Sequence, residues 1–132
     1  MRRDDSHRPK DWFARAMADL GAAAILLKHG GDRAVAAMHV QQAVEKALKG
    51  YLISKGWKLK RTHDLIQLLD QAVRFEAGFE KSRSFCEEAT AYFFEARYPL
   101  FISSRNYRKS EVRSAIRKAQ AIFELAETAE EE

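Results

Sequence analysis

Apolar residues recur along this chain every three or four positions, the spacing that is typical of helices with one buried face. One such stripe predicts a first helix over about residues 11–29, ended by two consecutive glycines. Its expected core positions are Phe13, Ala16, Met17, Leu20, Ala24 and Leu27. A second helix is predicted over about residues 32–54, with Asp32 as its N-cap and Gly56 just beyond its end. Its expected core positions are Ala36, Val40, Val44, Ala47, Leu48 and Tyr51.

The same spacing indicates three further helices. A short one begins after Thr62, which can cap it. Its expected core positions are Leu65, Leu68, Leu69 and Ala72. A fourth helix is predicted over about residues 80–97, because the residue before Pro99 resists the helical region. Its expected core positions are Phe85, Ala89, Tyr92, Phe93 and Ala96. A fifth starts at a Ser110 cap. Its expected core positions are Val112, Ala115, Ile116, Ala119, Ile122, Phe123 and Ala126.

Strand alternation, internal repeats and linkers are absent from this pattern. Four long helices with short connections predict an all-α domain, an antiparallel four-helix up-and-down bundle with an additional short helix. The single domain covers residues 1–132, with a core over about 10–127 and flexible ends, the last of them acidic.

Composition agrees with a folded, intracellular protein. Hydrophobic residues make up 46% of the chain, enough for a core. Cys86 is the only cysteine, so no internal disulfide can form, and a reducing compartment fits best. Neither a membrane-spanning run nor a secretory signal is present, so we expect a cytoplasmic protein that does not contact the membrane. The net charge of +4 leans weakly towards anionic partners.

Metal and cofactor chemistry find no support in the sequence. The four histidines show neither HExxH nor Cys-His zinc spacing, and GxGxxG and Walker A sequences are absent. We therefore expect no metal and no cofactor. Cys86, in the middle of an aromatic helix, is interpreted as a packing residue and not as a nucleophile.

A polar flank accompanies the core stripe of the second helix. Its members, at spacings of three, four and three, are His39, Gln42, Lys46 and Lys49. Gln41 and Glu45 lie on another flank, from which Glu45 can pair with Lys49 four residues on. One interpretation is a solvated helix face held by such pairs. The other is a binding site.

The segment "RTHDL", residues 61–65, opens the third helix. With Thr62 as the cap, His63 and Asp64 fall in the first turn, where Asp64 gains from the helix dipole. The free N–H groups of that turn and Arg61 also suit an anion. The segment is therefore either a helix start alone or part of a binding site.

Together these segments resemble a known family. The stretches "DWFARAMADLGAAAILLKHG", "HVQQAVEKALKGYLISKG", "RTHDL" and "ARYP", in this order, resemble the prokaryotic HEPN domain over about residues 10–127. The resemblance is to the small stand-alone type that pairs with a minimal nucleotidyltransferase. It implies an all-helical homodimer that binds a nucleotide or RNA and works with a separate nucleotidyltransferase in a toxin–antitoxin type pair.

The resemblance also implies a site. The implied ligand-binding residues are His39, Gln42, Lys46, Lys49, Arg61, His63 and Asp64. In this arrangement His39, Gln42 and Lys46 face His63 and Asp64 across a cleft. The alternative is that these polar groups hydrogen-bond each other and join two helices, because buried polar groups need partners.

A catalytic subset of the family cleaves RNA without metal, using an arginine, a polar residue and a histidine, with about four to six residues between the arginine and the histidine. Arg105 and Asn106 match the opening pair, but Ser110, Glu111 and Val112 stand where the histidine is expected. We therefore assign no catalytic residues and expect no cleavage of this kind. The alternatives are a divergent ribonuclease toxin that uses other histidines, and a purely structural partner subunit without a ligand.

Aromatic and basic residues alternate between the last two predicted helices, where they can stack on bases and neutralise phosphates or seal a dimer interface. The residues of this candidate RNA or dimer surface are Arg97, Tyr98, Arg105, Asn106 and Tyr107. The alternative is that the aromatic residues cover the core and the arginines are solvated.

Overall fold

The computed structural model of the chain describes residues 6–97 and 106–131, and in these residues it is helical without strands. The all-α class is therefore confirmed. The elements are α1 Pro9–Lys28, α2 Arg33–Ser54, α3 Leu65–Phe75, the 3₁₀ helix η2 Ala77–Ser82, α4 Arg83–Arg97 and α6 Lys109–Glu130. No helix in this part of the chain is both long and apolar enough to cross a bilayer.

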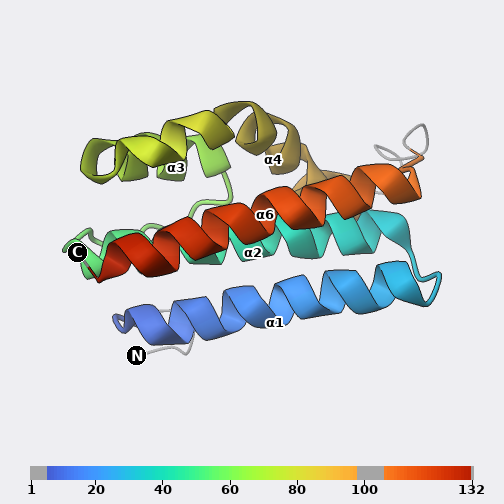
Figure 1. Cartoon of the computed structure of the whole chain (residues 1–132), viewed down its shortest axis with the longest axis horizontal. Coiled ribbons are helices and arrows are strands. Elements are labelled where there is room, and N and C mark those ends of the chain that lie inside the picture. The colour runs from blue at the N-terminus through green and yellow to red at the C-terminus, as the bar shows by residue number, and fades with distance from the viewer. Residues whose placement is uncertain (1–5, 98–105, 132) are drawn as a thin grey trace.

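Helix α2 is the central element, because it packs against α1, α3, α4 and α6. Figure 1 shows α1, α2 and α6 lying along one another, with α3 and α4 as a shorter row beside them. A tight turn joins α1 to α2. There Gly30 takes a φ of 72° that favours glycine, and Asp32 accepts a hydrogen bond from the Val35 N–H at 3.0 Å. The start of α1 and the end of α6 lie at the same end of the molecule.

Close packing of α1 on α2 depends on Gly50. A Cβ at this position would lie 3.0 Å from Phe13 Cε1 and 3.0 Å from Trp12 Cβ, closer than ordinary contacts. The two helices can therefore approach only where α2 has no side chain. With α3, α4 and α6 packed on it as well, α2 has most of its residues buried, including the three polar side chains of Gln41, Glu45 and Lys49.

The expected cores of α2 and α3 are confirmed, since all the residues predicted for them are buried. The expected core of α1 is partly wrong. Met17 is 60% exposed and Ala24 is also exposed, whereas Trp12, Asp19 and Ala23 are buried. The buried face of α1 includes Asp19, which contacts His39 and Lys46 of α2, and Met17 lies outside this face.

Two predicted helix starts need correction. Helix α4 begins at Arg83 and not near residue 80, because Glu76 caps the preceding 3₁₀ helix through the Gly78 N–H at 3.0 Å. Helix α6 has Arg108 as its N-cap, and Ser110 lies inside the first turn. The Glu111 carboxylate accepts from the Arg108 N–H at 3.2 Å, as in half of a capping box. At its other end α6 continues to Glu130. Pro99 lies outside the described residues.

Candidate functional site

The polar flank of α2 is divided between two groups of contacts, of which the first faces α1. His39 Nδ1 lies 2.9 Å from Asp19 Oδ1. The Lys46 ammonium donates to Gln42 Oε1 at 3.1 Å and to Asp19 Oδ2 at 3.4 Å. Asp19 is only 8% exposed, and in the α1–α2 contact its carboxylate pairs with the Lys46 ammonium and lies within hydrogen-bond distance of the His39 ring. This group joins the two helices.

The second group faces the segment before α3 and is more deeply buried. The Lys49 ammonium donates to Glu45 Oε2 at 2.9 Å, and His63 Nδ1 lies 2.8 Å from Glu45 Oε1. The Gln41 amide nitrogen donates to Glu45 Oε1 and to the His63 main-chain oxygen, both at 3.1 Å. Gln41 is completely buried, and Glu45 and Lys49 are each 5% exposed. These contacts attach residue 63 to the centre of the molecule.

Rings cover both ends of this second group. Lys49 Nζ lies 5.7 Å from the Trp12 ring centroid, a cation–π distance. The His63 ring stacks on Phe93 with 4.0 Å between centroids and 17° between planes. The His63 side chain stays half exposed, so the imidazole has one face on the protein and one edge in solvent.

The charge of Glu45 is stabilised where it lies. Burial raises the pKa of its carboxyl, but the charge of Lys49 and the hydrogen bonds from His63 and Lys49 outweigh burial, so the pKa is lowered. Gln41 Oε1 is the one buried side-chain polar atom without a hydrogen-bond partner in the described part of the chain. Both acceptors of the Gln41 amide nitrogen are fixed, so reversing the amide would break two bonds to satisfy one atom.

The structure thus separates the residues that were predicted to form one cleft. His39 and Lys46 contact Asp19 of α1, and Gln42 accepts from Lys46, while His63 contacts the Glu45 side of α2. Lys49 is buried against Glu45 and does not lie on an open flank. The protein itself provides the hydrogen-bond partners that the alternative interpretation requires. The ligand-binding role of these residues stays a prediction.

At the start of α3 the predicted cap is wrong by two residues. Asp64 is the N-cap and accepts from the Ile66 N–H at 2.9 Å, so His63 precedes the helix. Thr62 Oγ1 instead accepts from the Asp64 N–H at 3.1 Å. Arg61 is exposed beside this turn. The side chains of Thr62 and Asp64 each accept a hydrogen bond from the main chain two residues further on. In this conformation the His63 main-chain oxygen accepts from Gln41 of α2.

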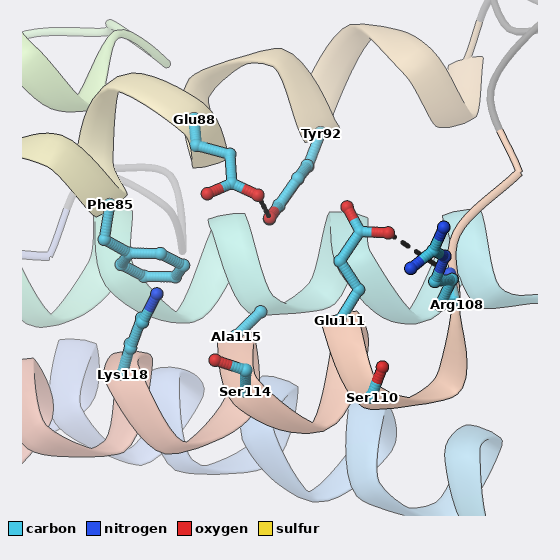
Figure 2. Close-up of a pocket in the computed structure, with 9 residues that line it drawn as sticks. All are labelled: Phe85, Glu88, Tyr92, Arg108, Ser110, Glu111, Ser114, Ala115 and Lys118. Carbon is cyan, nitrogen blue, oxygen red and sulfur yellow. Dashed lines mark hydrogen bonds between the residues drawn. The ribbon is translucent and has the colours of Figure 1, made fainter.

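A groove of about 490 Å³ lies elsewhere, between α4 and the first half of α6. Figure 2 shows its lining side chains, which converge from both helices. They are Phe85, Glu88, Tyr92, Arg108, Ser110, Glu111, Ser114, Ala115 and Lys118. The Tyr92 hydroxyl donates to Glu88 at 2.9 Å, and Lys118 Nζ lies 5.7 Å from the Phe85 ring centroid. The groove therefore offers cations, carboxylates, hydroxyls and aromatic rings in one concave place.

Two exposed cations, Arg108 and Lys118, line the groove together with the carboxylates of Glu88 and Glu111. Neither Arg108 nor Lys118 forms an ion pair with any residue that the structure describes, and both are exposed. Arg108 stands at the N-terminus of the 22-residue α6, where unpaired N–H groups and the helix dipole favour an anion. This end of the groove is thus electrostatically suited to a phosphate.

The groove includes positions from the incomplete ribonuclease motif. Ser110 and Glu111 line it, whereas Val112 is buried in the core with 1% exposure. Sequence reasoning did not find Phe85, Glu88, Ser114 and Lys118 as site residues. The available signal was their spacing, since positions 110, 114 and 118 share a flank of α6 next to its apolar stripe.

The candidate RNA or dimer surface from the sequence can be placed only in part. Tyr98, Arg105 and the side chain of Arg97 lie outside the described residues. Asn106 is exposed. Tyr107 is 4% exposed and does not belong to a surface, because its ring packs edge-on against Tyr92 with 5.5 Å between centroids. Its main-chain oxygen accepts from Arg33 Nη1 at 2.9 Å, which fixes the start of α6 to α2.

Comparison with known proteins adds a family to this geometry. The family model described as the HEPN domain matches residues 9–129, nearly the whole chain. No curated protein and no solved structure matches the chain. The family match supports a role related to nucleotides or RNA in general terms.

Proposed function

Because this chain belongs to the HEPN domain family, we propose that it binds a nucleotide or RNA in the groove between α4 and α6. We propose further that it works with a separate nucleotidyltransferase in a toxin–antitoxin type pair. The observation that carries the binding proposal is the pair of exposed cations, Arg108 and Lys118, in a groove that also holds aromatic rings.

The groove fits a nucleotide in size and in chemistry. Its volume of about 490 Å³ lies within the range of roughly 300–1,000 Å³ that is usual for small-molecule sites. The Arg108 end would take the phosphate, and the edges of Phe85 and Tyr92 would contact the base. Ser110 and Ser114 supply hydroxyls for the sugar.

Carboxylates limit what the groove accepts. Glu88 and Glu111 can accept hydrogen bonds from sugar hydroxyls or base amino groups, but they repel additional phosphates. We therefore infer that the groove holds a single nucleotide unit, either free or as part of an RNA chain, and does not hold a polyphosphate.

A groove-filling substitution tests the proposal. Ser114→Trp places a large ring in the groove and should abolish binding of a fluorescent oligoribonucleotide in anisotropy titrations. Ala121→Trp, on an exposed part of α6 outside the groove, is the matched control and should bind like the wild type. Competition with nucleoside monophosphates then separates a mononucleotide site from an RNA site. Equal binding by both variants would refute the proposal.

The pairing with a nucleotidyltransferase rests on the family alone. We expect a short nucleotidyltransferase in the reading frame beside the coding sequence of this chain, and co-purification of the two proteins after joint expression. We also propose a homodimer. Absence of such a neighbour together with failure to co-purify with a minimal nucleotidyltransferase would exclude this part of the proposal.

A ribonuclease is the second candidate function, and one observation favours it. The Glu45 carboxylate orients the half-exposed His63 ring through Nδ1, as carboxylates do for histidines that move protons. Incubation of labelled single-stranded RNA with the protein in excess chelator decides between the two. Our first proposal predicts intact RNA, whereas cleavage that disappears in His63→Ala would establish the enzyme.

A further inference from the structure

The carboxylate of Glu88 lies on the α4 side of the groove, and a neighbouring side chain fixes its orientation. The Tyr92 hydroxyl, four residues further along the same helix, donates to Glu88 Oε1 at 2.9 Å. Tyr92 is only 2% exposed, so this donor is held in place by the core. Figure 2 shows the other Glu88 oxygen pointing away from Tyr92, towards the Phe85 side of the groove. In the described part of the chain Glu88 makes no other hydrogen bond or ion pair.

The hydrogen-bonding capacity of this side chain is one-sided. As a carboxylate, Glu88 accepts hydrogen bonds through two adjacent oxygens and donates none. Each oxygen has two lone pairs, so Oε1 can accept from a ligand in addition to Tyr92. Asparagine and glutamine, whose amides place a donor beside an acceptor, are absent from the described lining of the groove. The α4 side therefore favours a ligand that presents two adjacent donors.

Guanine differs from the other RNA bases in this property. Its Watson–Crick edge carries two neighbouring donors, the ring N1–H and the N2 amino group. Adenine and cytosine each place one amino donor beside a ring nitrogen that accepts, and uracil places one N–H between two carbonyl oxygens. A carboxylate that contacts any of these three bases with both oxygens directs one oxygen at a lone pair. Two hydrogen bonds without repulsion are available from guanine alone.

The position of Glu88 in the groove suits contact with a base. Arg108 precedes Lys118 by ten residues on α6, and the rise of 1.5 Å per residue places the two about 15 Å apart along the helix. Figure 2 shows Phe85 at the Lys118 end, with Glu88 between Phe85 and Arg108. A nucleotide with its phosphate at Arg108 would extend its base towards Phe85, and the edge of the base would meet Glu88.

The second carboxylate of the groove is placed differently. Glu111 accepts from the Arg108 N–H at 3.2 Å, so it belongs to the first turn of α6 at the end that suits a phosphate. It therefore acts on the phosphate, which it repels, and not on the edge of the base. Of the two glutamates, Glu88 is the one that can distinguish bases.

We propose that Glu88 makes the groove selective for guanine by accepting hydrogen bonds from N1–H and the N2 amino group. The inference rests on the proposed function, because it requires the groove between α4 and α6 to hold a nucleotide unit. A bidentate contact of this kind corresponds to a preference of about tenfold, at the low end for such contacts, since Glu88 is exposed to water.

Competition between bases tests the selectivity. The four nucleoside monophosphates displace the fluorescent oligoribonucleotide from the wild type in anisotropy titrations, as do uridine oligoribonucleotides that carry one guanosine, adenosine or cytidine. Guanosine monophosphate, or the oligoribonucleotide with one guanosine, should act at about tenfold lower concentration than the others. Inosine monophosphate, which lacks the N2 amino group, should fall between guanosine and adenosine monophosphates. Equal displacement by all four bases would overturn the proposal.

An isosteric substitution tests the residue. In Glu88→Gln the amide oxygen can keep the hydrogen bond from Tyr92, so the NH₂ group takes the place of the oxygen that points into the groove. The preference for guanine should then nearly disappear, and adenosine monophosphate should bind more tightly than it does to the wild type. Glu87→Gln is the matched control, because Glu87 is exposed on α4, does not line the groove and carries the same charge. It should keep the preference. A Glu88→Gln variant that still prefers guanine by about tenfold would refute the role of Glu88.

Failure of this inference differs from failure of the proposed function. A fluorescent oligoribonucleotide that binds Ser114→Trp as well as the wild type, or binds neither, would exclude the groove as a nucleotide site and guanine selectivity with it. Binding that Ser114→Trp abolishes, but for which all four bases compete equally, would refute guanine selectivity alone. Guanine-selective binding that requires both an open groove and Glu88 is the result that we expect.

Discussion

The polar network around Glu45, formed with Gln41, Lys49 and His63, and the groove between α4 and α6 contain similar residue types. The charged side chains of α2 are buried in the network, whereas the cations of the groove are exposed. In the network the charge of Glu45 is matched by Lys49 at 2.9 Å, in a place from which water is almost excluded. In the groove Arg108 and Lys118 are exposed, and no described residue forms an ion pair with them. Charges of the first kind hold elements together, and charges of the second kind remain available to a ligand.

This difference reverses the emphasis that the sequence suggests. In the sequence the polar residues of α2 and His63 suggest a binding or reactive site. In the fold their hydrogen bonds connect α1, α2 and the start of α3. The serines and the lysine of α6 look like an ordinary solvated flank, yet they line the concave surface shown in Figure 2. Burial and neutralisation, and not residue type, separate the two.

The largest expected effect is on the network. Glu45→Ala removes the carboxylate that accepts from Lys49, His63 and Gln41, and it leaves the Lys49 ammonium buried without a counter-ion. Breaking a buried pair in this way costs about 3–5 kcal/mol, so urea denaturation should show a loss of that size. Glu88→Ala in the groove is the comparison, and it should cost less than about 1 kcal/mol because Glu88 is exposed.

Equal losses in the free energy of unfolding for Glu45→Ala and Glu88→Ala would contradict the distinction between the buried network and the exposed groove. If Glu45→Ala unfolded no more easily than Glu88→Ala, the buried network would contribute little to the fold. The residues of α2 would then be free to act as the ligand site, which is one of the two interpretations that the sequence leaves open.

Periodicity was sufficient to predict the helices and most of their cores. In α2 the apolar spacing identifies buried residues such as Val40 and Leu48, because α1, α3, α4 and α6 all pack against this helix. In α1 the same reasoning failed at Met17, which carries a core-type side chain on the outside. A sequence pattern cannot distinguish an apolar residue that faces the core from one that stays exposed on the outer side of the helix.

The polar contacts could be predicted only within one helix. The spacing of Glu45 and Lys49 predicts their pair, which is confirmed at 2.9 Å. The contact of Glu45 with His63 joins positions eighteen residues apart, and it depends on how the segment before α3 returns to α2. The groove likewise forms from flanks of α4 and α6 that meet only in the folded protein. Such contacts follow from packing and not from local pattern.

The second largest effect is expected on the stability of the protein in acid, because the network depends on the charge of Glu45. The pKa of the Glu45 carboxyl is lowered from its ordinary value of 4.5, so the stability linked to its charge is complete above that pH and is lost as the pH falls through the lowered pKa. Unfolding measured below pH 4.5 should therefore show a steeper loss of stability for the wild type than for Glu45→Gln, whose side chain does not titrate. Parallel curves for the two proteins would mean that Glu45 is not neutralised by Lys49 and His63.

A smaller loss is expected at the contact between α1 and α2. Lys46→Ala removes the donor to Gln42 and Asp19, whose distances of 3.1 Å and 3.4 Å indicate bonds of modest strength. We expect a cost of about 1 kcal/mol, seen as a fall of about 4 °C in Tm, and no change in binding of RNA. Lys58→Ala, at an exposed position, controls for the loss of one charge. Weaker RNA binding with an unchanged Tm would restore Lys46 as a ligand residue.

The smallest effect should appear in the salt dependence of binding to the groove. If Lys118 neutralises one phosphate of a bound single-stranded RNA, Lys118→Met removes about one released counter-ion and should flatten the plot of log affinity against log salt by about 0.7. Arg117→Met is the matched control, because this neighbouring cation is exposed on α6 but does not line the groove. Its loss should leave the slope almost unchanged, although both variants lower the net charge equally. Equal slopes for the two variants, both below that of the wild type, would mean that RNA is attracted by the general charge of α6. In that case the cations of the groove would not differ from other surface cations. The groove and the network on α2 would then differ in burial but not in their ability to bind RNA.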